Sequence, residues 1–108
     1  MKYVKQSDWI ELGKELLPGT LCQYCKTRPA TQGAHALIYK RYLPGAKNRK
    51  VTDVRENYMP CCDKCQKFSE TRAGRLRAWE VLCKREGEDH MREWHKSLPL
   101  KIKEQYHG

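Results

Sequence analysis

The sequence predicts an α+β domain in which a small central unit is held together by cysteines and flanked by helices. Three observations predict this fold. Four cysteines form two close pairs, Cys22-x-x-Cys25 and Cys62-x-x-Cys65. A short apolar stretch over residues 30–39 lies between the pairs. Apolar residues recur at helical spacing before the first pair and after the second. We therefore divide the single domain of residues 1–108 into an N-terminal helix (1–20), a cysteine-bracketed finger (21–72) and C-terminal helices (73–108).

The two cysteine pairs have the spacing of a zinc site. Each C-x-x-C pair forms a tight turn, and two such turns direct four thiolates at one tetrahedral centre about 2.3 Å away. We predict a structural Zn²⁺ bound by Cys22, Cys25, Cys62 and Cys65. Four thiolates complete the coordination, so this ion has no open position for water. Zinc ligation also contributes folding energy, which matters in a chain with only 39% hydrophobic residues. Cys61 and Cys83 fall outside this spacing and are expected to be small buried side chains.

The N-terminal segment is predicted to form one short helix. Ser7 and Asp8 have the character of an N-cap, and Pro18-Gly19 ends the segment. Between them, apolar residues follow helical spacing at Trp9, Leu12 and Leu16. The helix therefore has one apolar edge and is expected to act as a lid.

Two strands and a loop are expected between the cysteine pairs. Residues 30–39 favour a strand, with Gly33 allowing a bend just before His35. Residues 40–50 contain Pro44-Gly45 and favour a loop. A second, weaker strand is predicted from Val51, Val54 and Tyr58, and it ends at Met59-Pro60, after which Cys62 starts a helix.

A helical hairpin is predicted after the second cysteine pair. The first helix is marked by Leu76, Trp79, Leu82 and Cys83, with Gly87 as its C-terminal cap. Glu88 and Asp89 favour a new helix start. The second helix carries Met91, Trp94, His95 and Leu98 on one side. We expect this hairpin to cover the cysteine-bound core.

The positive charge is concentrated between the cysteine pairs. The net charge is +9, and residues 21–55 carry eight basic side chains against the single acidic Asp53. Such a surface favours nucleic acid as the partner, and a solvated loop that only keeps the protein in solution is the open alternative. The residues expected to contact phosphates are Lys40, Arg41, Lys47, Arg49, Lys50 and Arg55.

The cysteines also indicate a reducing compartment. The first twelve residues contain Asp8 and Glu11, which interrupt the apolar run that a secretory signal requires. No stretch approaches the roughly 18 apolar residues of a membrane span. We therefore expect a soluble protein of the cytoplasm, which is the host cytoplasm if the chain is encoded by a phage.

The order of these features resembles the HNH branch of the His-Me finger endonucleases. The run Glu-Asn57-Tyr-Met-Pro-Cys-Cys62-Asp-Lys-Cys65-Gln66 is similar to the segment of that family in which Asn precedes the second C-x-x-C by five residues. Gly33-Ala34-His35, Leu76-x-x-Trp79 and Gly87-Glu88 are similar to the phage recombination endonucleases of the NinG (Rap) type. The resemblance covers residues 20 to 95 and implies a zinc-bound ββα-metal finger.

The resemblance also implies a mechanism. His35 would be the general base that deprotonates a water for attack on a DNA phosphate, assisted by Mg²⁺ or Mn²⁺. Asn57 would fix the loop and orient His35. Gln66 stands where the family has a His or Asn that binds the catalytic metal, and Ala34 stands where an Asp or His is often found. With neither position charged, metal affinity depends on a carboxylate from Asp53, Glu56 or Glu70. The alternative is a catalytically inactive HNH-like zinc module that binds DNA or a host protein.

Overall fold

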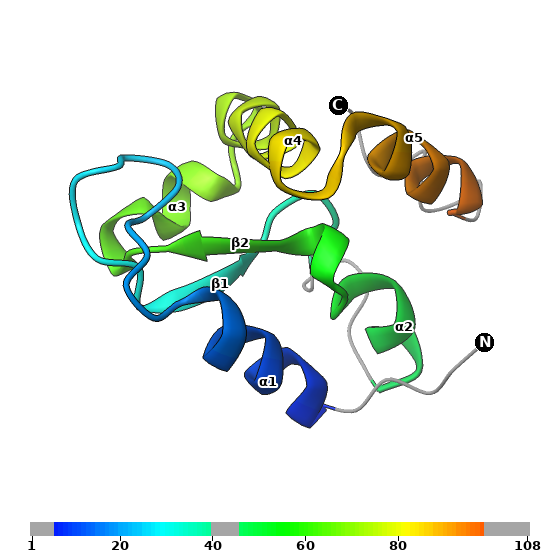
Figure 1. Ribbon diagram of the computed structural model, residues 1–108, viewed down its shortest axis with the longest axis horizontal. Coiled ribbons are helices and arrows are strands. Elements are labelled where there is room, and N and C mark those ends of the chain that lie inside the picture. Colours follow the sequence, from blue (N-terminus) through cyan, green and yellow to red (C-terminus); the bar gives the residue numbers. More distant parts are fainter. Residues whose placement is uncertain (1–5, 40–45, 99–108) are drawn as a thin grey trace.

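The computed structural model describes residues 6–39 and 46–98 and has an α+β architecture (Figure 1). Helix α1 (Gln6–Leu16) is followed by strand β1 (Gln32–His35), helix α2 (Arg49–Thr52) and strand β2 (Tyr58–Cys61). Helices α3 (Gln66–Ser69), α4 (Arg72–Glu86) and α5 (Glu88–Ser97) complete the described chain. Short 3₁₀ turns lie at Ala46–Asn48, Arg55–Asn57 and Asp63–Cys65.

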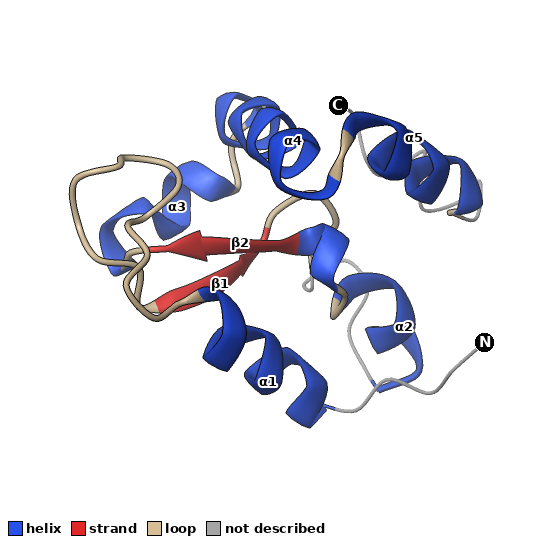
Figure 2. Ribbon diagram, viewed as in Figure 1, coloured by secondary structure: helices blue, strands red, loops and turns tan. Residues whose placement is uncertain are grey.

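The described sheet consists of β1 and β2 paired antiparallel. Gln32 lies opposite Cys61 at one end of the ladder, and His35 lies opposite Tyr58 at the other. Helix α1 lies on one side of this hairpin and α4 on the other, with α5 beside α4 (Figures 1 and 2). The second cysteine pair thus begins at the Gln32 end of the ladder, while His35 and Asn57 lie at the opposite end.

The core lies between the hairpin and the C-terminal helices. Side chains alternate between the two faces of a strand, so Ala34 and Met59, which are paired, share a face. Both are buried in one cluster with Ala78 and Leu82 of α4 and Met91 of α5. The predicted helical hairpin is therefore present and covers this face, with α4 ending at Gly87, whose φ is 98°. None of the described helices is long and apolar enough to cross a membrane.

The strands are shorter than the sequence predicts. Val51 was expected in the second strand but lies in α2, where one helical turn buries it without a strand partner. Val54 lies between α2 and the 3₁₀ turn that precedes β2, so it is not part of the strand either. Strand pairing stops after His35: the N–H of Ala36 still donates to the backbone oxygen of Asn57, but the N–H groups of Leu37 and Ile38 donate to the Asn57 side chain. Helix α3 begins at Gln66, one 3₁₀ turn later than the expected start at Cys62.

A network of ion pairs joins α1 to α4. Arg55 contacts Glu15 of α1 at 2.6 Å and Glu86 of α4 at 2.8 Å. Arg85 also binds Glu86, at 2.7 Å, and donates to the backbone oxygens of Arg55 and Tyr58. Burial alone would raise the pKa of Glu86, but the hydrogen bonds from Arg85 and Arg55 outweigh it and lower the pKa below its usual value. A lowered carboxyl pKa means that this network stabilises the fold at neutral pH and is lost as the pH falls through the folded-state pKa.

Gly33 is required by the ring of Tyr58. A Cβ atom at Gly33 would lie 2.2 Å from Cζ of Tyr58, whereas a Cβ at Gly13 of α1 would lie 2.9 Å from the Tyr58 hydroxyl and 3.5 Å from Cδ1 of Leu17. We expect Gly33→Ala to lower the free energy of unfolding by about 1–3 kcal/mol, because a buried ring must move. Gly13→Ala is the matched control and should change it by less than about 1 kcal/mol, since alanine also favours the helix. Urea unfolding of both variants measures this, and equal costs would contradict the steric explanation.

Candidate functional site

The four cysteines of the two pairs converge on one point. The Sγ atoms of Cys22, Cys25, Cys62 and Cys65 all lie within 4.8 Å of one another, and they form the only such metal-binding group in residues 6–39 and 46–98. The Sγ atoms of Cys25 and Cys62 are 3.9 Å apart. Zinc–sulfur bonds of about 2.3 Å in a tetrahedron place sulfurs about 3.8 Å apart, so the donor set fits zinc in both chemistry and size.

Backbone hydrogen bonds build the two turns that present these sulfurs, which we call knuckles 1 (residues 22–25) and 2 (residues 62–65). In knuckle 1 the N–H of Lys26 donates to the oxygen of Cys22 at 2.9 Å, and in knuckle 2 the N–H of Cys65 donates to the oxygen of Cys62 at 3.2 Å. The N–H of Gln23 donates to the oxygen of Pro60 at 3.0 Å, which ties knuckle 1 to β2. Knuckle 1 is thereby held beside knuckle 2 although 37 residues separate Cys25 from Cys62.

The knuckle backbone favours thiolates at the first pair. A hydrogen bond from the Thr27 hydroxyl to Cys25 Sγ, together with nearby backbone N–H groups, lowers the pKa of Cys25 to about 5. Burial would raise the pKa of Cys22, but backbone N–H donors outweigh it and lower the pKa. Burial instead raises the pKa of Cys65, and it raises that of Cys61 to about 12. Cys61 lies outside the cluster, fully buried, and its thiol donates to the oxygen of Cys62.

Asn57 fastens the far end of the hairpin. Its side chain is fully buried, and its Oδ1 accepts from the backbone N–H groups of Leu37 at 2.7 Å and Ile38 at 3.0 Å. Its Nδ2 donates to the backbone oxygens of Ile38 and Thr52, both at 2.9 Å. One amide therefore joins the segment that follows His35 to the end of α2, and it uses its acceptor and both donor positions to do so.

His35 is held between an aromatic ring and a carboxylate. Its ring stacks on Trp9 of α1, with centroids 4.0 Å apart and planes 2° apart. Its Nε2 lies 2.9 Å from Oδ1 of Asp53, whose side chain is 6% exposed. The Thr52 hydroxyl donates to the same oxygen at 2.9 Å. His35 keeps 22% of its side chain exposed, so it is oriented from two sides and still reaches the surface.

Arg49 extends this cluster. Its Nε lies 3.9 Å from Oδ2 of Asp53, beyond hydrogen-bond distance, and is buried without a hydrogen-bond partner among the described residues. Of the other predicted phosphate contacts, Lys47 and Lys50 are exposed beside it. Lys40 and Arg41 lie outside the described residues. Arg55 forms ion pairs with Glu15 and Glu86 and keeps 37% of its side chain exposed.

Neither Gln66 nor Ala34 offers a charged ligand beside the His35 ring: Gln66 lies outside the ladder, and Ala34, next to His35 in β1, faces the opposite side of the strand. Gln66 is exposed at the first position of α3, next to knuckle 2, whereas His35 pairs with Tyr58, three residue pairs or about 10 Å along the strands from Cys61. Ala34 is 2% exposed and points into the core, because side chains alternate along β1. A charged ligand at position 34 would therefore be buried among apolar groups.

The two residues that contact His35 were not identified as its partners from the sequence, where Asp53 was named only as one of three carboxylates that could bind a metal. Asp53 is the sole acidic residue in the basic segment 21–55, and this contrast is the one sequence pattern that could have pointed to it. Trp9 was assigned to the apolar edge of the N-terminal helix, and no pattern in the sequence places it on His35. Of the carboxylates considered as metal ligands, Glu56 binds His90 at 2.8 Å, so Asp53 is the one that contacts His35.

The Asn57 amide can be tested with an isosteric change. Asn57→Asp keeps the shape and the acceptor but places a carboxylate against the oxygens of Ile38 and Thr52. We expect a loss of about 2–4 kcal/mol in the free energy of unfolding near pH 7. Burial raises the folded-state pKa of the new carboxyl, so the loss should shrink towards about pH 5 as the protonated form regains a donor. Urea unfolding against the wild type at each pH measures this, and an equal loss at both values would contradict it.

Adjacent cysteines provide a test of the metal centre. Cys62→Ala removes one of the four converging sulfurs, and we expect it to abolish binding of one zinc ion per chain. Cys61→Ala is the matched control, and it should keep the zinc while costing roughly 1 kcal/mol of stability from lost packing. Zinc content by elemental analysis and thermal unfolding measure both effects. Loss of zinc in the Cys61 variant, with zinc retained in the Cys62 variant, would show that Cys61 is the ligand in place of Cys62.

Comparison of the chain with protein-family models, with curated proteins and with solved structures finds no match in any of the three. The function is therefore inferred from the chain's own geometry. Its two informative features are the four-cysteine cluster at one end of the hairpin and the His35–Asp53 pair at the other.

Proposed function

We propose that this chain is an HNH-like, metal-dependent DNA endonuclease whose β1, β2 and α3 form a zinc-stapled ββα finger. The observation that carries the proposal is the 2.9 Å contact between His35 Nε2 and Asp53 Oδ1, beside an Arg49 Nε that has no hydrogen-bond partner among the described residues. A histidine, a carboxylate and an arginine in one partly exposed cluster can move a proton and bind a phosphate. A role in phage recombination or DNA processing in the host cytoplasm is part of this proposal.

His35 would act as the general base. In the tautomer that donates from Nε2 to Asp53, the lone pair is on Nδ1, and this nitrogen accepts the proton of the attacking water. Asp53 stabilises the imidazolium that forms, and the flat stack on Trp9 fixes the plane of the ring. The hydroxide attacks phosphorus, the bond to the leaving oxygen breaks, and that oxygen takes a proton from solvent. Asn57 acts indirectly, by holding the segment after His35.

Asp53 supplies the anionic oxygen that positions 34 and 66 lack. Mg²⁺ and Mn²⁺ prefer carboxylate oxygens, and Asp53 is the carboxylate in contact with His35. Asp53 is therefore the residue that would hold such an ion, which when bound would supply positive charge next to the scissile phosphate, while His35 keeps its lone pair for the proton of water. Arg49, whose side chain is 23% exposed beside Asp53, would contact a phosphate oxygen with the exposed part of its guanidinium, and the exposed Lys47 and Lys50 would contact neighbouring phosphates.

The second candidate is a zinc module that binds DNA or a host protein without cutting. Two observations favour it. Trp9 covers one face of His35 at 4.0 Å, and position 66 carries a neutral glutamine that is exposed at the start of α3. In that case the His35–Asp53 pair stabilises the hairpin, and the basic residues bind a partner on their own.

Cleavage assays with two histidine variants separate these candidates. Supercoiled and branched DNA are incubated with the zinc-loaded protein and added Mg²⁺ or Mn²⁺. We expect cleavage by the wild type, and a loss of about 100-fold or more in His35→Ala, the usual range for a general base. His90→Ala is the matched control, because His90 forms a similar pair with Glu56 at 2.8 Å but is 53% exposed on α5. It should cut as the wild type does.

The same assay shows whether the protein lacks only one ligand of the catalytic metal or lacks nuclease activity altogether. Cleavage that persists in His35→Ala would overturn His35 as the base. No cleavage by the wild type with either metal, but cleavage by Gln66→His, would show that the finger lacks one metal ligand. No cleavage by either protein, with salt-sensitive DNA binding retained, would establish the binding module in place of the nuclease.

A further inference from the structure

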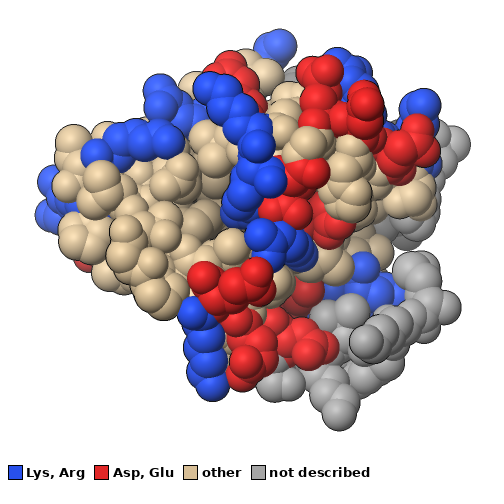
Figure 3. All heavy atoms as spheres, viewed as in Figure 1, with Lys and Arg blue, Asp and Glu red and all other residues tan. Residues whose placement is uncertain are grey.

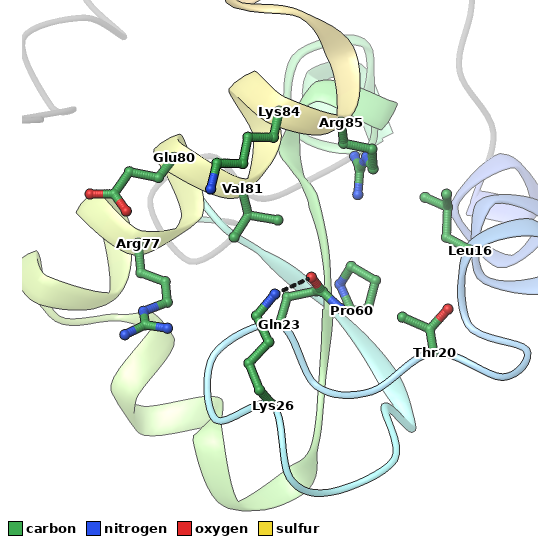
Figure 4. Close-up of a pocket in the computed structure, with 10 residues that line it drawn as sticks. All are labelled: Leu16, Thr20, Gln23, Lys26, Pro60, Arg77, Glu80, Val81, Lys84 and Arg85. Atoms are coloured by element: carbon green, nitrogen blue, oxygen red, sulfur yellow. Dashed lines mark hydrogen bonds between the residues drawn. The ribbon is translucent and has the colours of Figure 1, made fainter.

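A basic pocket opens between α4 and knuckle 1, away from the predicted basic loop. Its volume is about 480 Å³, and Pro60 of β2, Val81 of α4 and Leu16 of α1 supply its apolar lining. Figure 4 shows Arg77 and Lys84 extending into it from α4, with Lys26 reaching towards them from the knuckle side. Glu80 lines the same pocket, but its carboxylate points away from these three cations in Figure 4.

The chain segments that contribute the three pocket cations are basic as a whole. Residues 21–31 and 62–84 together contain eight Lys and Arg residues and three Asp and Glu residues. Figure 3 shows basic side chains over α4 and the knuckle side of this face, while acidic side chains gather towards α1 and α5. Four thiolates on one zinc would add about two negative charges, and the excess of five positive charges leaves this side basic. Residues 21–31 and 62–84 thus have a larger excess of basic over acidic side chains than residues 46–61, which contain four basic and two acidic side chains.

Lys26 has a backbone conformation that lysine rarely adopts. Its φ of 61° is the only positive φ of a non-glycine residue in the described chain, and glycine adopts such a value at less cost. Its ammonium is held by the side-chain oxygen of Gln23 at 3.0 Å, at the mouth of the pocket. The left-handed turn and the hydrogen bond from Lys26 to Gln23 together aim one cation into the pocket from knuckle 1.

We propose that this pocket is a docking site for the phosphodiester backbone of duplex DNA. Lys26, Arg77 and Lys84 would contact phosphates, and the Gln23 amide adds a neutral donor. Among the three cations, Lys26 is held by Gln23 before binding, so it loses less conformational freedom on contact than the exposed side chains of Arg77 and Lys84. Charge complementarity identifies the occupant, since a polyanion with regularly spaced charges can meet the pocket and the basic side chains around it together.

This inference rests on the proposed function only in taking DNA as the partner. The pocket adds a second surface, built by α4 and knuckle 1, to the one beside His35. A duplex held there would be anchored on the zinc-bound end of the hairpin, so binding affinity and cleavage would depend on different residues.

The test is the salt dependence of DNA binding without added Mg²⁺ or Mn²⁺. The pocket variant carries Lys26→Gly, Arg77→Ala and Lys84→Ala, and the control variant carries Lys14→Ala, Arg92→Ala and Lys96→Ala. Each removes three positive charges, and the control residues lie on α1 and α5 in exposed ion pairs. Fluorescence anisotropy with a short duplex measures the affinity, and zinc content and thermal unfolding verify the fold. Lys26→Gly relieves the left-handed backbone strain, so it should not destabilise the knuckle.

We expect the pocket variant to bind about tenfold or more weakly at low salt, with the slope of log K against log[salt] reduced by about 3. The control variant should bind close to the wild type. Equal losses in both variants would overturn the proposal and leave a general charge effect. Displacement of the duplex by polyglutamate at equal charge concentration would also overturn it, because an acidic protein would then be the occupant.

Failure of this proposal and of the proposed function are distinguishable. Normal DNA binding by the pocket variant together with His35-dependent cleavage would overturn the pocket proposal and support the nuclease proposal. Weakened DNA binding by the pocket variant, with no cleavage by any form of the protein, would support the pocket proposal and overturn the nuclease proposal.

Discussion

The buried amide of Asn57 is the contact on which the arrangement of the site depends. The hairpin has four residues in each strand, too few to hold its own ends, and Asn57 joins the backbone after His35 to the end of α2 with four hydrogen bonds. Asp53 directly follows α2, so the same amide brings the carboxylate to the histidine. At the opposite end the four converging sulfurs tie knuckle 1 to knuckle 2. The hairpin is therefore fastened at both ends by polar groups, while packing against α4 and α5 covers one face.

The four converging sulfurs and the His35–Asp53 pair are separated in space. The sulfur cluster lies at the Cys61 end of the ladder, and the His35–Asp53 pair lies at the Tyr58 end, so a metal bound by the cysteines is remote from any proton transfer at His35. Helix α1 makes two contacts near the Tyr58 end, where Trp9 stacks on the imidazole of His35 and Glu15 joins the ion-pair network of Arg55 and Glu86. The basic side chains divide similarly, with Arg49 beside Asp53 and the pocket cations beside the knuckle.

The sequence was sufficient for the features that depend on local spacing. The four sulfur donors follow from C-x-x-C spacing, the α+β class from a short apolar stretch between segments of helical periodicity, and the C-terminal helical hairpin from periodicity and Gly87. The sequence did not predict where a strand ends because its backbone N–H groups bind a side chain instead of a neighbouring strand. Residues 36–39 look like a strand because they are apolar and buried, but the donors of Leu37 and Ile38 go to Asn57. Val51 and Val54 favour a strand by β-branching, and tertiary burial places Val51 in a helical turn instead. The Trp9 and Asp53 contacts with His35 are tertiary, so no periodicity reports them.

The adjacent cysteines of β2 and knuckle 2 have a consequence for folding fidelity. Cys61 is buried in the core and Cys62 presents its sulfur to the cluster, so neighbouring thiols point to different environments. A strand that slips by one residue exchanges its two faces, which here would offer Cys61 to the metal while turning Met59 out of the core. Closing the coordination sphere with Cys62 therefore discriminates between the two registers. A metal bound by these cysteines would therefore favour the correct register of β2 in addition to holding the two knuckles together.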